Sequence, residues 1–115
     1  MNLELTHLHV LITGGSKGIG LACAAAYAGK GVRVNAVNPG LTLTERLHEG
    51  MQAEARQQGI SIEEALTRAK ATRPLGRIAE PSEIADAVVY VASKRATYIT
   101  GAVVVMDGAV TPMVV

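Results

Sequence analysis

A glycine-rich turn directly behind an apolar run is the feature that most constrains the fold of this chain. The turn spans residues 13–20 and follows His-Val-Leu-Ile at 9–12. A buried strand that ends in such a turn and opens into a helix brings free backbone N–H groups to a pyrophosphate. The pattern therefore predicts a dinucleotide-binding turn, with candidate cofactor-binding residues Gly14, Ser16, Lys17, Gly18, Ile19 and Gly20.

The rest of the chain alternates predicted strands with predicted helices. Apolar runs and turn signals predict strands over residues 8–13, 32–37 and 102–106, and helices over 18–29, 43–58, 62–71 and 81–93. Thr42 with Glu45, and Ser61 with Glu64, have the spacing of capping boxes. This order predicts an α/β fold with an abbreviated Rossmann-like parallel sheet of about three strands, flanked by helices.

Size and composition predict one small domain. The chain has 115 residues and a mass of 12.0 kDa, with 49% hydrophobic but only 3% aromatic residues, so its core must use Ala, Val, Leu and Ile. The net charge is +1 without a basic run, which argues against a nucleic-acid surface. Residues 1–6 lack the pattern of an export or membrane segment, so a soluble cytoplasmic protein is expected.

Two features predict self-association. A sheet of three strands leaves long edges unpaired, and the tail over residues 109–115 is apolar for a chain end. A homo-oligomer that uses the sheet edge and this tail would cover both. We therefore expect an oligomer.

Three sequence blocks, in this order, resemble the short-chain dehydrogenase/reductase family. The first is the turn from Thr13 to Gly20, which matches Thr-Gly-x-x-x-Gly-x-Gly. The second is the segment 33–40 (Arg-Val-Asn-Ala-Val-Asn-Pro-Gly) with Thr44, and the third runs from Arg73-Pro74-Leu75-Gly76-Arg77 to Asp107-Gly108. The resemblance covers nearly the whole chain. It implies an NAD(P)-dependent oxidoreductase that transfers hydride between a nicotinamide and an alcohol or carbonyl group.

The second block supplies the remaining candidate cofactor-binding residues. The resemblance implies that Pro39, Gly40 and Thr44 border the nicotinamide, although Thr44 is equally well explained as a residue that starts a helix. Asn38 stands where a dinucleotide site usually places an acid for the ribose hydroxyls. Lys17 gives a weak preference for NADP, since it could face a 2′-phosphate; a solvated turn lysine is the alternative.

The chain departs most from the family pattern between Lys30 and Gly31. In the family, about half the protein lies between the first helix and the Arg-Val-Asn strand, including the catalytic Ser and the Tyr-x-x-x-Lys pair. Here that span is missing, so residues 1–115 are predicted to form a single truncated NAD(P)-binding domain, with 43–71 as a helical lid segment. Two local departures are Ala109, where a second glycine is usual, and Thr42, where an aliphatic residue is common.

No catalytic residue is predicted. Tyr90 and Lys94 have the Tyr-x-x-x-Lys spacing, which on one helix face lets an ammonium lower the pKa of a phenol. They fall in the C-terminal block, however, where Tyr90 is expected to fill a packing position. Tyr27 and Lys30 are only three residues apart and flank a helix end, which makes them poorer candidates still.

No metal site is predicted either. His7 and His9 project to one side of a strand, but no third ligand is placed to complete a site, and His48 lies on a remote helix. Cys23, the single cysteine, is expected to be a small buried hydrophobe, since it lies in an alanine-rich helical stretch.

The shortening leaves two questions open. The strands at 8–13 and 32–37 could lie side by side through a crossover, which we favour, or two copies of the chain could exchange elements. The chain could be an inactive derivative of an oxidoreductase with weak or lost cofactor binding, or a non-catalytic nucleotide-binding or assembly module. It could also be an engineered or remnant fragment.

Overall fold

The structure is a computed structural model that describes residues 4–5, 8–12 and 18–111. The chain divides into two compact units, each of which is described below by itself. The sheet unit consists of Met1–Asn38 and Ala85–Val104, and the hairpin unit consists of Pro39–Ile84 and Val105–Val115.

A three-stranded parallel sheet organises the fold, in the order β1-β2-β3. Its strands are β1 (His9–Leu11), β2 (Arg33–Pro39) and β3 (Val103–Met106). β1 pairs with β2 in parallel, with His9 opposite Arg33. The favoured side-by-side arrangement of the first two predicted strands is thus confirmed, as is the predicted α/β fold class with about three strands.

The boundaries of all three strands differ from the predicted ones, most at β1 and at the end of β2. β1 is only three residues long, whereas β2 continues through Asn38 and Pro39, where a turn was expected. Proline fits the end of a strand because its missing N–H removes only one ladder hydrogen bond. Beside β2, the backbone N–H of Ala36 donates to the carbonyl of Ala102 (2.9 Å), and that of Gly101 donates to Val34 (2.7 Å).

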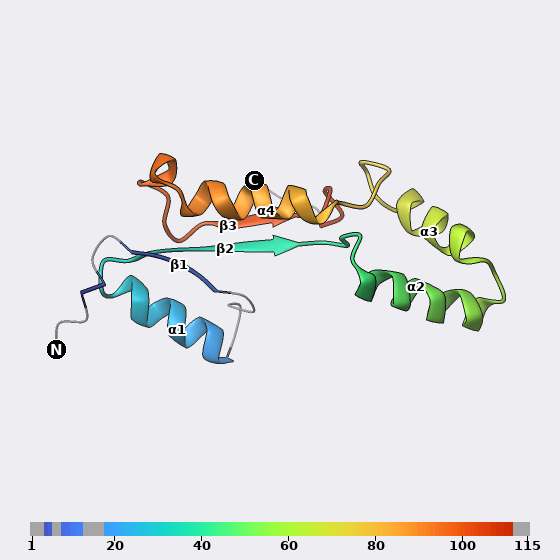
Figure 1. The fold of residues 1–115 in the computed structure, drawn as a ribbon, viewed down its shortest axis with the longest axis horizontal. Helices are drawn as coiled ribbons and strands as arrows, with labels where there is room; N and C mark the ends of the chain where they lie inside the picture. Colours follow the sequence, from blue (N-terminus) through green and yellow to red (C-terminus); the bar gives the residue numbers. More distant parts are fainter. Residues whose placement is uncertain (1–3, 6–7, 13–17, 112–115) are drawn as a thin grey trace. The chain divides into compact units, whose positions relative to one another are not determined.

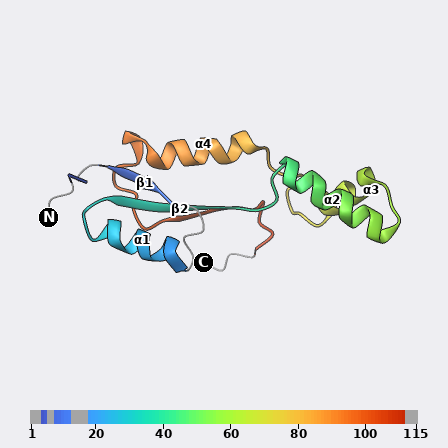
Figure 2. The ribbon, with the colours of Figure 1, turned by 60° about the horizontal axis from the view of Figure 1, so that its bottom comes forward.

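In the sheet unit, helices cover both faces of the sheet. The first is α1 (Gly18–Ala28), and the second is formed by residues 85–92 of α4 (Pro81–Ala92); they lie on opposite sides of the strands (Figures 1 and 2). α4 buries Val91, which is 8% exposed. α1 has no buried residue.

Two burial predictions are wrong for the same reason. Cys23 on α1 is exposed, and so is Tyr90 on α4. Tyr90, expected to pack, retains 51% of its surface. Each helix presents more apolar positions than a three-stranded sheet can cover, so the positions turned away from the strands stay in contact with solvent.

Two polar side chains tie β2 to the segment before β3. Asn35 is 7% exposed; its side-chain amide donates to the carbonyl of Ile99 (2.9 Å) and accepts the backbone N–H of Ala102 (3.1 Å). Thr100 accepts the backbone N–H of Val34 through its hydroxyl (3.1 Å). These contacts satisfy backbone groups at the sheet end, where regular pairing begins.

The hairpin unit contains the helices α2 (Glu45–Gln58) and α3 (Ile62–Ala71), which pack against each other (Figure 1). Ala55 on α2 and Ala65 on α3 are each 5% exposed and are the buried residues of these two helices. Gly59 ends α2 in the left-handed conformation, with φ of 67°.

Helix capping was predicted correctly for α3, whereas for α2 the capping-box spacing of Thr42 was misleading and the alternative role of Thr44 as a helix-starting residue is confirmed. The hydroxyl of Ser61 accepts the N–H of Glu64 (3.1 Å), as its sequence spacing predicts. For α2 the cap is Thr44, whose hydroxyl accepts the N–H of Leu47 (3.2 Å), and not Thr42. Thr42 instead forms an isolated parallel bridge with Ala79, two residues before the cap.

A short 3-10 helix, η1 (Lys94–Ala96), follows α4 and was not predicted. Within the described ranges, the structure has no helix with the length and apolar character needed to cross a bilayer.

Candidate functional site

The predicted strand–turn–helix unit is present as far as the structure describes it. β1 ends at Leu11, and α1 begins at Gly18. Gly14, Ser16 and Lys17, three of the predicted cofactor-binding residues, lie outside the described residues. Gly18, Ile19 and Gly20 form the first three residues of α1.

The start of α1 has the local properties of an anion-binding helix end. Gly18 has φ of +63°, a conformation that suits glycine, and a Cβ built on it would meet no described residue within 4 Å. Ile19 is 84% exposed. The first turn of α1 contains no acidic residue, and the first N–H groups of a helix have no partner within the helix. These described residues therefore fit a phosphate group.

Pro39 is the last residue of β2, Gly40 follows it, and Thr44 is the N-cap of α2, so all three lie near the start of the hairpin unit. Gly40 donates its backbone N–H to the carbonyl of Met106 (3.0 Å), and a Cβ on Gly40 would lie 2.9 Å from both Cα and Cβ of Asp107. Glycine is therefore required here by close packing of two backbones. Thr44 caps α2 through its oxygen, which leaves its hydroxyl proton as a possible donor.

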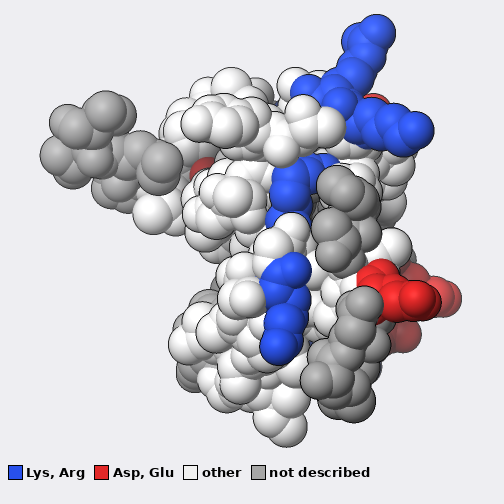
Figure 3. Space-filling view, turned by 90° about the vertical axis from the view of Figure 1, so that its left-hand side faces the viewer, with Lys and Arg blue, Asp and Glu red and all other residues white. Residues whose placement is uncertain are grey.

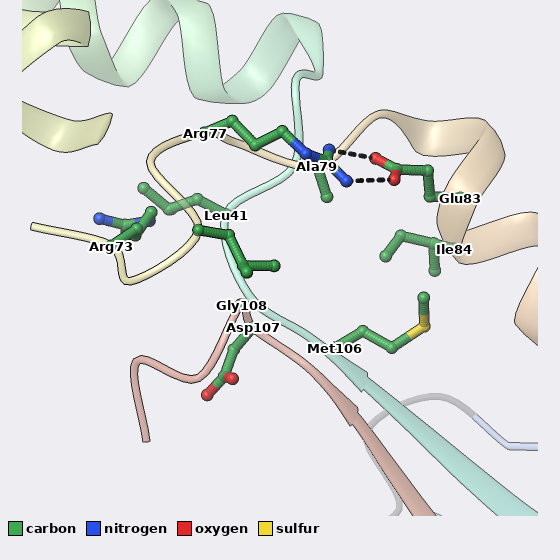
Figure 4. Close-up of a pocket in the computed structure, with 10 residues that line it drawn as sticks. Leu41, Arg73, Arg77, Ala79, Glu83, Ile84, Met106, Asp107 and Gly108 are labelled. Atoms are coloured by element: carbon green, nitrogen blue, oxygen red, sulfur yellow. Dashed lines mark hydrogen bonds and ion pairs between the residues drawn. The ribbon is translucent and has the colours of Figure 1, made fainter. Parts of the chain in front are cut away.

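The loop adjoins a pocket of about 170 Å³ in the hairpin unit (Figure 4), which sequence reasoning did not predict. Its wall is largely apolar, with Ile84 and the thioether of Met106 on one side. The lining residues are Leu41, Arg73, Leu75, Arg77, Ala79, Glu83, Ile84, Met106, Asp107 and Gly108. Most belong to the C-terminal block of the resemblance, the only sequence signal that pointed to this region.

One ion pair in this pocket is bidentate. Arg77 and Glu83 form two nearly parallel hydrogen bonds, Nη1 to Oε2 at 2.7 Å and Nη2 to Oε1 at 2.6 Å (Figure 4). The bonds from Arg77, together with the backbone N–H of Glu80, lower the pKa of Glu83 to about 2. The same contact raises the pKa of Arg77. Glu83 is therefore a fixed carboxylate, unsuited to exchange protons near neutral pH.

Asp107 organises the turn after β3. Its carboxylate accepts the backbone N–H groups of Ala109 (2.9 Å) and Thr111 (3.0 Å). The hydrogen bonds from Thr111 and Ala109 lower the pKa of Asp107. Ala109 has φ of +66°, the left-handed conformation in which the glycine usual at this position is unstrained.

Tyr90 and Lys94 do not share a helix face, because α4 ends at Ala92 and Ser93 is extended, with ψ of 166°. The hydroxyl of Ser93 then caps η1 by accepting the N–H of Arg95 (3.2 Å). The spacing of this pair in sequence is therefore not the spacing that a phenol and an ammonium need.

The other candidate residues stand on different elements, apart from Tyr27 and Lys30, which are joined through the backbone. Lys30 follows the end of α1 and donates its backbone N–H to the carbonyl of Tyr27 (2.9 Å). His9 begins β1, and its Nδ1 is 2.8 Å from Nη2 of Arg33. His48 lies on α2, with Nε2 at 3.4 Å from Nε2 of Gln52. His7 lies outside the described residues.

Comparisons with known proteins identify the family. A family model described as enoyl-(acyl carrier protein) reductase matches residues 14–111. The chain is 43% identical over 90 residues to galactitol 2-dehydrogenase (L-tagatose-forming) from Cereibacter sphaeroides, covering 78% of this chain and 32% of the relative. The chain therefore belongs to the short-chain dehydrogenase/reductase family.

Solved structures agree. A short chain dehydrogenase family protein from Francisella tularensis subsp. tularensis SCHU S4 matches 80% of this chain and 38% of its own, with a TM-score of 0.73 and 35% identity. A variant of actinorhodin polyketide ketoreductase, crystallised with NADPH, matches 91% of this chain and 48% of its own, with a TM-score of 0.72 and 27% identity. The chain spans about a third of the length of the curated relatives it matches.

Proposed function

We propose that this chain is a shortened member of an NAD(P)-dependent oxidoreductase family that has kept a dinucleotide-binding turn but not the proton-transfer residues. The observation that carries the proposal is the start of α1. There, Gly18 adopts a left-handed conformation at the start of a helix that follows a strand of a parallel sheet, and no described residue would lie within 4 Å of a Cβ built on it. A nicotinamide dinucleotide would place its pyrophosphate at these N–H groups.

The individual roles follow from the residues. Gly14, Gly18 and Gly20 would allow the close backbone approach, and Ser16, Lys17 and Ile19 would complete the turn. The resemblance implies that Pro39, Gly40 and Thr44 would border the nicotinamide, with the Thr44 hydroxyl as a donor to its carboxamide. The weak preference for NADP rests on Lys17. One relative was crystallised with NADPH, which supports a nicotinamide dinucleotide as the ligand class.

We propose that this 115-residue chain has no dehydrogenase activity by itself. This proposal is supported by the sequence, in which no counterpart of the family's catalytic Ser is recognised, and by α4, which ends before Lys94 and so separates Lys94 from the helix face of Tyr90. Bound cofactor would supply a hydride, but the chain has no predicted group to exchange the accompanying proton. Cofactor binding would also be weak, because the missing family segment would have formed part of the adenine and nicotinamide pockets. Its role would then be that of a nucleotide-binding module in a reducing, cytoplasmic setting.

The alternative of an assembly module is favoured by exposed apolar surface. β3 is an edge strand, and Val103 on it is 62% exposed. Val89 on α4 is 67% exposed. An edge strand with exposed apolar residues favours pairing with a second copy. We propose a homo-oligomer through this edge and the C-terminal tail, which sedimentation equilibrium tests; a monomer at high concentration would contradict it.

Cofactor binding is tested by titrating the chain with NADPH and following the fluorescence of the dihydronicotinamide. Gly18→Asp places a carboxylate where the pyrophosphate would lie, and Gly50→Asp adds the same charge in the interior of α2. We expect binding to be lost only in the first variant. Equal binding by both variants, or none by the parent at millimolar NADPH, would contradict the proposal.

Inactivity is tested separately, by following NADPH oxidation with a panel of ketones and aldehydes. We expect no turnover. Turnover that persists in Tyr90→Phe would contradict the proposed inactivity and require an unidentified acid. An intact mass establishes which molecule is assayed, since about 12 kDa corresponds to the printed sequence. A mass near twice that value would mean that a catalytic segment is present.

A further inference from the structure

A second anion site is indicated at the opposite end of the sheet, where the strands begin. A pocket of about 500 Å³ opens there in the sheet unit. It is lined by Leu8, His9, Gly31, Arg33, Lys94 and Thr97. These six residues contain two permanent cations and one imidazole but no acid, so the pocket has a positive potential.

Arg33 provides the fixed charge of this pocket. Its Nη1 donates to the carbonyls of Val91 (3.0 Å) and Ile99 (2.8 Å), and its Nη2 donates to that of Ser93 (3.3 Å) and contacts Nδ1 of His9. Among the described residues, its hydrogen-bond partners are all neutral acceptors. The half-buried guanidinium is thus positioned but its charge is not neutralised by a carboxylate, which favours an anion nearby.

The hydrogen bond from Arg33 to Nδ1 of His9 leaves Nε2 of His9 as a hydrogen-bond donor. A guanidinium can only donate, so Nδ1 of His9 must accept the hydrogen bond from Arg33, which is 2.8 Å long. In the neutral imidazole the ring proton then resides on Nε2. Because the exposed ring lines the pocket, this N–H is available to a ligand.

Two flexible polar groups complete the donor set. Lys94 and Thr97 are exposed and line the pocket from either end of η1. Within the described part of the chain, neither side chain has a hydrogen-bond or ion-pair partner. Figure 3 views this end of the sheet unit and shows Lys and Arg side chains distributed over it. An ammonium, a hydroxyl and an imidazole N–H around a fixed cation match the oxygens of a phosphate group.

We propose that this pocket binds a phosphate group, either free or as a monoester. Its volume exceeds the space of a phosphate alone, and Leu8, which is 49% exposed, offers an apolar surface to an attached organic group. The site lies at the start of β1 and β2, whereas the proposed dinucleotide turn follows the end of β1. The two sites are therefore distinct within one unit.

The test uses the 115-residue chain, titrated at constant ionic strength with inorganic phosphate and with phenyl phosphate, while amide NMR shifts are recorded. We expect saturable shifts at residues 31–33 and 94–97. Tighter binding of phenyl phosphate assigns the site to monoesters, and equal binding assigns it to free phosphate. The absence of saturable shifts with either probe would overturn the proposal.

Two variants distinguish phosphate binding in this pocket from nonspecific attraction of phosphate by the net charge of the chain. Lys94→Gln removes a lining ammonium, and Arg95→Gln removes the same charge from the neighbouring residue, which does not line the pocket. We expect binding to weaken about tenfold in the first and less than about twofold in the second. Equal weakening in both would overturn the proposal, because it would show attraction by net charge alone.

Phosphate titrations in the presence of NADPH, or in a variant of the glycine turn, distinguish the proposed phosphate pocket from the proposed cofactor site. With NADPH present at saturation, or in the Gly18→Asp variant, phosphate should still shift residues 94–97. Loss of those shifts in both conditions would place the phosphate at the glycine turn and overturn a second site. Failure of NADPH to bind leaves the phosphate titration of Lys94→Gln fully interpretable.

Discussion

Gly40 and Asp107 meet so closely that a Cβ on Gly40 would lie 2.9 Å from both Cα and Cβ of Asp107. The loop after β2 and the turn after β3 thus pack backbone against backbone in the hairpin unit. The hydrogen bond from the Gly40 N–H to the carbonyl of Met106 fixes the same approach. This contact explains the glycine of the Asn-Pro-Gly segment without reference to any ligand.

Gly40→Ala is expected to destabilise the fold by about 2 kcal/mol, because backbone atoms of Asp107 cannot move as a flexible side chain can. Gly50→Ala is the matched control. It lies inside α2, where a Cβ meets nothing within 4 Å, and should stabilise the chain by about 1 kcal/mol. Urea unfolding measures both. Equal effects of the two substitutions would show that the close contact does not constrain the fold.

Ala109→Gly is expected to stabilise the chain by roughly 0.5–1 kcal/mol. The φ of +66° strains a residue with a Cβ, and part of the gain is offset by the greater freedom of glycine in the unfolded chain. Ala53→Gly, on the exposed side of α2, should instead cost about 1 kcal/mol. Thermal unfolding compares the two. Loss of stability in Ala109→Gly would mean that the turn is not left-handed at this residue.

The pair Arg77–Glu83 is expected to make stability depend on pH at the acid end. The pKa of Glu83 is lowered from 4.5 to about 2 by Arg77 and the Glu80 N–H, so its contribution is complete above pH 4.5. This contribution decreases as the pH falls toward 2. Carboxyl NMR should give a midpoint near 2, and Arg77→Gln should move it back toward 4.5. A midpoint near 4.5 in the parent chain would contradict the two-bond geometry.

Asn35→Ala is expected to cost about 2 kcal/mol, since it removes two buried hydrogen bonds and leaves the Ala102 N–H without its acceptor. Asn38→Ala changes the same residue type near the exposed end of the strand and should alter stability by less than about 0.5 kcal/mol. The midpoints of denaturant unfolding measure the stability of both variants. Similar midpoints for the two variants would mean that Asn35 does not connect β2 to β3.

The sequence predicted element types well because each element carries a local signal. The span 62–71 of α3 was predicted to the residue, because Ser61 and Glu64 lie at its first turn. The cap of α2 was misplaced, since Thr42 and Thr44 both precede the helix and only the bridge to Ala79 removes Thr42 from that role. Burial was the weaker prediction, because the exposure of Cys23 and Tyr90 depends on how many strands lie beneath the helices.

The candidate sites show the same difference between local signals, which the sequence reveals, and long-range contacts, which it does not. The glycine turn was predicted because glycine spacing is local, and the described part of it, Gly18–Gly20, lies at the start of α1 as expected. The pocket containing Arg77 and the pocket containing Arg33 were missed. Each depends on residues from distant parts of the chain, such as Arg33 and Lys94, that only the parallel topology brings together.

The central claim, that a retained turn still holds a dinucleotide, is tested most directly by mapping NADPH onto the amide NMR spectrum of the intact chain. We expect saturable shifts concentrated at Gly18, Ile19 and Gly20, which should disappear in Gly18→Asp and persist in Gly50→Asp. Saturable shifts confined to residues 94–97, or no shifts at millimolar NADPH, would contradict it.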